Sequence, residues 1–120
     1  MRVEEIIKRA EALGLPIAEN EFIKTKEKPL PEPPYLIWYD DETNGDGGDG
    51  VVLFKRRKIV LELYTDKVGD AEIERRIEKE VLYDVKYNKY QAPVESEDLV
   101  QTAYDFMVVE KIPKGERKYG

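Results

Sequence analysis

The pattern of apolar and polar positions is clearest in the middle of the chain, where it predicts a long β-hairpin. Two runs rich in aromatic and β-branched residues, Tyr35–Tyr39 and Ile59–Thr65, flank the tract Asp41–Asp49, which contains only Asp, Glu, Asn, Thr and Gly. The two runs suit a pleated, half-buried surface, whereas a tract with nothing to bury suits a solvated turn. We therefore expect an antiparallel hairpin with a flexible tip.

The second arm of this hairpin is predicted to extend from Val51 to Thr65, which is long for one strand. The charged run Lys55–Lys58 interrupts its alternation, so we expect a bulge or a sharp twist there. Beyond that run, alternation places one set on each face: Ile59, Leu61 and Leu63 on the first, and Val60, Glu62 and Tyr64 on the second.

Apolar positions that recur every three or four residues predict two helices. The first covers Val3–Leu13, and it ends there because Gly14 can adopt a left-handed conformation and Pro16 prevents continuation. The second covers about Ala71–Leu82, with Asp70 as the residue that caps its first turn.

Three further strands are predicted outside the hairpin and the helices. Ile17–Ile23 and Asp84–Tyr90 are short candidates, and Leu99–Val109 shows the most regular period of two. Gln91–Asp98 contains a proline and several acids, so we expect a turn. The segment Thr25–Pro34, with four prolines, is expected to be an extended connector.

The predicted elements follow one another in the order α-β-β-β-α-β-β, which is typical of an α+β fold. We expect an antiparallel sheet of about four to five strands, with two helices packed on one face. Residues 1–112 are expected to form a single domain, and residues 113–120 a disordered tail.

The composition argues against most enzymatic chemistry. The chain has no cysteine and no histidine, and Ser96 is its only serine, so Ser-His-Asp and Cys-His nucleophiles and thiolate metal sites are excluded. Catalysis by carboxylates alone stays formally open, but 26 acids in 120 residues single out no pair. We predict that the protein is not an enzyme and has no cofactor and no metal.

The charge and the apolar runs restrict the partners. A net charge of −6 and an isoelectric point near 4.9 argue against a general nucleic-acid binder. No apolar run approaches the length of a transmembrane helix, and the first residues lack the apolar core of a secretory signal. We therefore expect no membrane contact and a protein made and used in the cytoplasm.

Three clusters could carry binding, and each has a simpler structural interpretation. Asp40, Glu42 and Asn44 match the start of a calcium-binding EF-hand loop, but Val51 stands where a glutamate is required, which favours a solvated hairpin tip. The run Lys55–Lys58 could contact phosphate, a neighbouring subunit, or only solvent at a charged edge. Aromatic residues could form a platform for stacking bases, or simply pack on the sheet: Trp38, Tyr39, Tyr83, Tyr87 and Tyr90.

Several local sequences, taken in order, resemble one known family. An N-terminal helix ends in LGLPIAENEF, a strand PPYLIWY precedes a polar loop, and KIVLELYTDK is followed by a helix that opens GDAEIERRIEK. The matching region closes with YNKYQAPVESEDLVQTAYDFMVVE. This order, over about residues 3–110, is similar to the tail-completion, or tail-to-head joining, proteins of long-tailed bacteriophages and prophages. The Asp/Gly-rich tract departs from that pattern.

The resemblance implies a structural role in virion assembly. Such proteins cap the tail tube and dock it to the head connector, and some act as six-membered rings through which DNA passes without specific binding. A head-completion stopper and a minor tail component are alternatives of the same class, and a soluble module that binds or inhibits another protein is one of a different class. The subunit can stay monomeric in solution until a tail templates the ring. The implied location is the host cytoplasm during assembly and then the virion head–tail junction.

The hairpin and its charged run are the expected contact surfaces of such a subunit. A strand edge with free backbone groups can accept a strand from a neighbour, and a projecting hairpin can provide one. The candidate assembly interface consists of residues from both arms and the tip: Trp38, Tyr39, Asp46, Asp49, Lys55, Arg56, Arg57 and Lys58.

Overall fold

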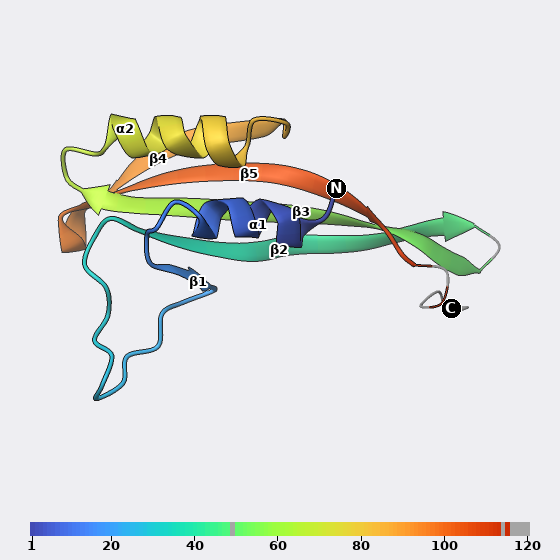
Figure 1. Ribbon diagram of the computed structural model, residues 1–120, viewed down its shortest axis with the longest axis horizontal. Helices are drawn as coiled ribbons and strands as arrows, with labels where there is room; N and C mark the ends of the chain where they lie inside the picture. Colours follow the sequence, from blue (N-terminus) through green and yellow to red (C-terminus); the bar gives the residue numbers. More distant parts are fainter. Residues whose placement is uncertain (49, 114, 116–120) are drawn as a thin grey trace.

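The computed structural model describes residues 1–48, 50–113 and 115, and these form a five-stranded sheet with its helices on one face (Figure 1). The strand order in the sheet is β1-β2-β3-β5-β4. The strands are β1 (Ile17–Glu19), β2 (Tyr35–Gly48), β3 (Val51–Asp66), β4 (Tyr87–Val94) and β5 (Leu99–Lys111). The helices are α1 (Val3–Glu11), α2 (Ala71–Arg76), the π-helical turn η1 (Ile77–Val81) and the 3₁₀ turn η2 (Glu95–Glu97). The predicted α+β class and element order are confirmed.

The hydrophobic core lies between the helices and one face of the sheet. Its helical side comes from α1 and from the end of the second helix: Val3, Ile6, Ala10, Ile77, Val81 and Leu82. Its sheet side comes from three neighbouring strands: Leu36, Ile59, Leu61, Leu63, Tyr104, Phe106 and Val108. The predicted alternation of the two long strands therefore points the correct residues inward.

The sheet is mixed, whereas the sequence predicted a wholly antiparallel one. β1 pairs in parallel with β2, from Ile17 opposite Leu36 to Glu19 opposite Trp38. β1 is also shorter than the predicted Ile17–Ile23, because Asn20 adopts a positive φ of 67° and turns the chain away from the sheet. The other three pairings are antiparallel.

The polar tract predicted to be the hairpin tip is mostly strand. β2 continues to Gly48, and its residues from Glu42 onward pair with β3. The register of β2 against β3 shifts between Asp40 and Glu42. The irregularity that we expected in the charged run of β3 therefore lies on β2, opposite Lys58. A second shift follows Asp46, where a side chain on Gly47 would lie 1.8 Å from the carbonyl oxygen of Val51. Only glycine fits that position.

The boundaries of the later elements also differ from the prediction. β4 covers Tyr87–Val94, so half of the predicted turn is strand, and the turn itself is η2 followed by Asp98 at φ 55°. Pro93 is tolerated there because β4 is at the edge of the sheet. The helix predicted over Ala71–Leu82 is capped by Asp70 as expected but ends in the π-helical turn.

The molecule is elongated, with principal extents of 51 × 34 × 25 Å, because β2 and β3 continue far beyond the helices (Figure 1). We call this projection the arm: residues 40–48 of β2 with residues 51–59 of β3. β1 pairs only with Leu36–Trp38, and the first residue of β4 lies opposite Phe106. The outer edge of β2 and the outer edge of β5 therefore lack a described strand partner along the arm.

Two further expectations concern the ends and the surface of the chain. Of the predicted disordered tail, residues 114 and 116–120 lie outside the described residues. Within the ranges that are described, no helix has the length and apolar character needed to cross a membrane.

Candidate assembly surfaces

The basic run Lys55–Lys58 occupies a central strand and is matched by acids on its neighbour. It pairs with β2 on one side and with β5 on the other, so the interpretation as an edge segment is wrong. Arg56 forms an ion pair with Asp46, and the Lys58 ammonium lies 3.7 Å from a carboxylate oxygen of Asp41. These pairs help to explain why the polar tract of β2 forms a strand, since Asp41 and Asp46 each find a cation across the hairpin.

Arg57 joins three elements on the helical side of the arm. Its Nε donates to Oδ2 of Asp40 at 2.8 Å, and its guanidinium lies 3.4 Å from Oε1 of Glu110 on β5. Glu110 is only 7% exposed, and its Oε2 accepts the backbone N–H of Val3 at 2.8 Å. The carboxylate thus caps α1, where a negative charge is favourable. Burial opposes ionisation of Asp40, but hydrogen bonds from Thr43 and Arg57 lower its pKa.

The face of the sheet opposite the helices carries a polar cluster centred on Glu62; we call this face the outer face. Glu62 is 9% exposed, although no helix covers it. Its carboxylate accepts hydrogen bonds from the Tyr64 hydroxyl at 2.9 Å, the Gln101 amide at 2.9 Å and the Tyr39 hydroxyl at 3.4 Å. Three donors on three neighbouring strands therefore hold one carboxylate flat against the sheet.

The tyrosines of this cluster predict a loss of stability in alkali. Burial, together with the nearby Glu62 carboxylate, raises the pKa of Tyr39 and of Tyr64 to about 12. Unfolded tyrosine ionises near its ordinary value of 10, so the stabilisation is complete below pH 10 and is lost as the pH rises towards 12. The double substitution Tyr39→Phe and Tyr64→Phe should flatten this slope, as measured by urea unfolding across that range.

A residual slope is expected in that double variant, because burial also raises the pKa of Tyr104. The prediction fails if the wild-type protein and the double variant lose stability equally steeply between pH 10 and 12.

The aromatic residues proposed as a stacking platform do not share a surface, so that hypothesis is wrong. Trp38 packs against the core on the helical side, and Tyr87 packs edge-on against Tyr104, with ring centroids 5.5 Å apart. The Arg9 guanidinium covers the ring of Tyr83 at 4.5 Å. Tyr39 and Tyr90 lie on the outer face instead.

The predicted interface residues therefore divide into three groups. Arg56, Arg57, Lys58 and Asp46 lie in the arm and form ion pairs within the chain. Trp38 and Tyr39 lie at the base of the arm, on opposite faces of β2. Lys55 is exposed and pairs in register with Gly45 and Glu110, while Asp49 lies outside the described residues.

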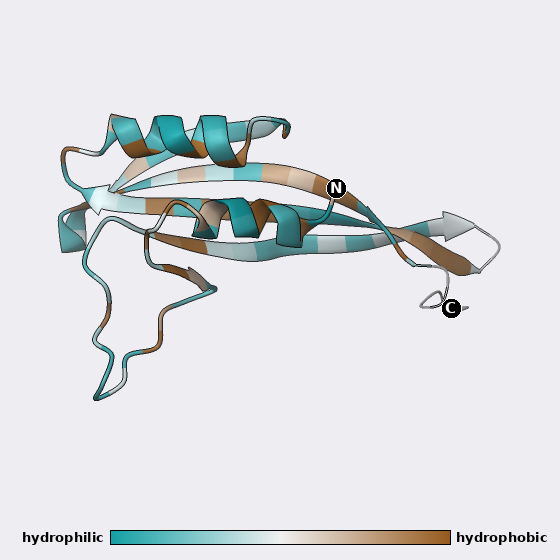
Figure 2. Ribbon diagram, viewed as in Figure 1, coloured by the Kyte–Doolittle hydropathy of each residue, from teal (hydrophilic) through white to brown (hydrophobic). Residues whose placement is uncertain are grey.

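Sequence reasoning missed the role of the acids in the arm. A regular hairpin register counted back from the turn would place Asp46 opposite Leu53, whereas the shift after Asp46 moves it opposite Phe54, so counting alone does not give this pairing. Glu110 could not have been found in that way, because it is more than fifty residues from Arg57. Figure 2 shows that the first part of β3, at the tip of the arm, is apolar, whereas the stretch of β2 beside it is not.

The connector between β1 and β2 forms a second exposed surface. It extends away from the sheet (Figure 1), and its apolar residues Ile23 and Leu30 are 77% and 53% exposed. Phe22 anchors its start by an edge-on contact with Tyr35, with ring centroids 5.5 Å apart. Single exposed apolar residues are common on protein surfaces, so these two by themselves do not mark a contact surface.

Among the described residues, no group of three or more acids could hold a metal ion. Three acids in the described part of the arm pair with cations of β3: Asp40, Asp41 and Asp46. The geometry defines an α+β protein with a projecting arm and two strand edges that differ in sequence. Neither the models of known protein families nor the curated proteins include one that matches this chain.

Proposed function

We propose that this chain is a structural subunit of a bacteriophage particle that completes the tail and joins it to the head, acting as a ring of copies. One observation carries the proposal: the sheet has two unlike strand edges without a described partner along a projecting arm. Two different surfaces that bind each other produce a ring when the rotation between copies closes. The sequence resemblance over about residues 3–110 supports the same assignment.

The proposed partners are further copies of the chain, the tail tube protein and the head connector protein. DNA would pass through the ring without specific binding, which the net charge of −6 supports because a negative surface repels the phosphate backbone. The proposed location is the head–tail junction of the virion, after assembly in the host cytoplasm. The role involves no catalysis, which is consistent with a chain that lacks histidine and cysteine.

Deleting the gene from its phage genome tests the proposal and separates it from the alternatives. If the chain is a tail-completion protein, deleting its gene should leave tails that are overlong or lack heads, and restoring the gene should restore infectious particles. Filled heads that leak DNA would instead indicate a head-completion stopper. Electron microscopy of the lysate distinguishes these results.

Intact and infectious particles after the deletion would contradict the proposal. They would favour the soluble binding module, for which the exposed connector with Ile23 and Leu30 provides a surface. The neighbouring genes offer an independent check, because a tail-completion gene is expected beside genes for portal, capsid and tail tube proteins.

A further inference from the structure

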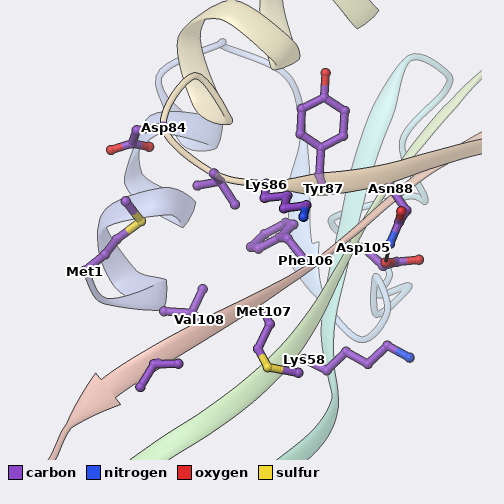
Figure 3. A pocket seen from close by; sticks show the side chains of 12 residues that line it. Met1, Lys58, Asp84, Lys86, Tyr87, Asn88, Asp105, Phe106, Met107 and Val108 are labelled. Carbon is purple, nitrogen blue, oxygen red and sulfur yellow. Dashed lines mark hydrogen bonds between the residues drawn. The ribbon is translucent and has the colours of Figure 1, made fainter.

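A slot of about 750 Å³ lies beside β5 (Figure 3). It starts where the first residue of β4 lies opposite Phe106, and beyond that point the edge of β5 that faces away from β3 has no described neighbour. Its walls come from both faces of the sheet. Phe106 and Val108 lie on the helical face, whereas Met107 and Val109 lie on the outer face and are 54% and 52% exposed. A bound strand directs successive side chains to opposite faces, so a slot with apolar walls on both faces fits a strand.

The backbone of β5 is oriented to accept that strand. The N–H of Ile112 donates to the carbonyl oxygen of Leu53, so it points towards β3. Because hydrogen-bonding direction alternates along a strand, Met107, Val109 and Lys111 direct their N–H and C=O groups away from β3, into the slot or beside it. These groups continue the edge that β4 occupies as far as Phe106.

We propose that the slot binds the outer edge of β2 from the arm of a second copy of this chain. Beyond Trp38, that edge has no described partner, and it projects from the molecule (Figure 1). The added strand would continue the line of β4 along β5. This inference rests on the proposed function, since it names the contact that would link subunits in the ring.

Charge favours this occupant. β2 contains four acids and no lysine or arginine. Asp40, Asp41 and Asp46 pair with cations of their own β3, whereas Glu42 accepts from the neutral amide of Asn44 and keeps its charge for a neighbour. Lys86 lines the slot and Lys111 lies at its end, while Lys58 already pairs with Asp41. Of the acids in the slot, Asp84 pairs with Arg9 at 2.7 Å, and Asp105 accepts from the Asn88 amide at 2.9 Å. Glu42 of the incoming strand therefore meets lysines at the rim, and rising salt should weaken the contact.

Cysteine pairs test the contact directly, because the native chain contains no cysteine. Asn44 and Glu42 lie opposite Arg56 and Lys58 on β3, on the outer face with Val109. Paired strands are close enough for a disulfide. We expect Val109→Cys combined with Asn44→Cys or with Glu42→Cys to link separate copies when concentrated full-length protein is oxidised. Val68→Cys with Asn44→Cys is the matched control, because Val68 is an exposed valine in a turn.

The results are read by gel electrophoresis. A ladder of linked subunits in either pair, and its absence in the control, supports the contact. The proposal is overturned if neither pair forms links, or if the control forms them equally. It is also overturned if Val109→Cys alone gives linked dimers as abundantly as the pairs, because that result indicates pairing of β5 with β5.

A charge substitution separates failure of this contact from failure of the proposed function. Val109→Glu places a carboxylate where the acidic strand of the second copy would lie, and like charges discourage pairing; Val68→Glu is its control. In phage, Val109→Glu should abolish head–tail joining, while Val68→Glu should preserve it. Normal joining with Val109→Glu would overturn the contact but not the function. If the cysteine pairs link but deletion of the gene leaves particles intact, the proposed function is overturned and the contact stands.

Discussion

Replacing Tyr104 by alanine is expected to lower the free energy of unfolding by about 3–5 kcal/mol, as for other large-to-small changes in a core. Tyr104 is fully buried in β5, and its hydroxyl donates to Oε2 of Glu78 at 2.8 Å. The substitution leaves a cavity between the sheet and the second helix, and it removes a hydrogen-bond donor from Glu78. Because small domains are stable by only about 5–15 kcal/mol, urea unfolding should show a much lower midpoint.

Tyr104→Phe is the matched control, because it keeps the ring and removes only the hydroxyl. The expected loss is about 0.5–1.5 kcal/mol, the usual net contribution of one hydrogen bond. Glu78 keeps its other partner, the Lys89 ammonium at 2.8 Å. Equal losses for the two variants would show that the cavity contributes nothing, and would contradict the assignment of Tyr104 to the core.

Replacing Arg57 by methionine is expected to cost about 2–3 kcal/mol. The change keeps the apolar stem but removes the cation between Asp40 and Glu110, and Glu110 is then a buried carboxylate without that partner. Removing one partner of a fully buried pair costs about 3–5 kcal/mol, and the 24% exposure of the Arg57 side chain reduces this value. The measurement is urea unfolding at neutral pH.

A double-mutant cycle identifies the cause of that loss. Glu110→Gln removes the charge but keeps an oxygen that can accept the N–H of Val3. If the stranded carboxylate is responsible, Glu110→Gln should recover part of the stability lost in Arg57→Met, giving a clearly non-additive cycle. Strictly additive effects would mean that the loss does not come from Glu110 but from the pair with Asp40 or from packing.

The sequence predicted the strands and helices wherever a local pattern coincides with one buried face. Ile59, Leu61 and Leu63 alternate, and all three are fully buried against the helices. The first helix follows from local rules in the same way, although it ends at Glu11 and not at the predicted Leu13; Gly14, which has φ +84°, follows that end. The tract after Asp40 was misread as a tip, because its strand depends on cations that lie ten or more residues away.

The residues of the candidate interface were chosen for their character and not for their partners, which only the fold supplies. The basic run seemed free for binding, yet Arg56 and Arg57 are neutralised by acids of the same chain. The slot beside β5 was not predicted at all. It exists because β4 begins only at Tyr87, opposite Phe106, while β5 continues to Lys111, and no local pattern shows how long one strand is relative to its neighbour.

The sequence by itself determined the α+β class, the order of the elements and the inward-facing set of the long strands, because each depends on a period of two or of three to four residues. The tertiary structure alone decided which edges stay unpaired, where Glu110 meets Arg57 and α1, and how Glu62 is held by three strands. Those features depend on register and on contacts between distant residues, and pairing in a sheet fixes them only when the whole fold has formed.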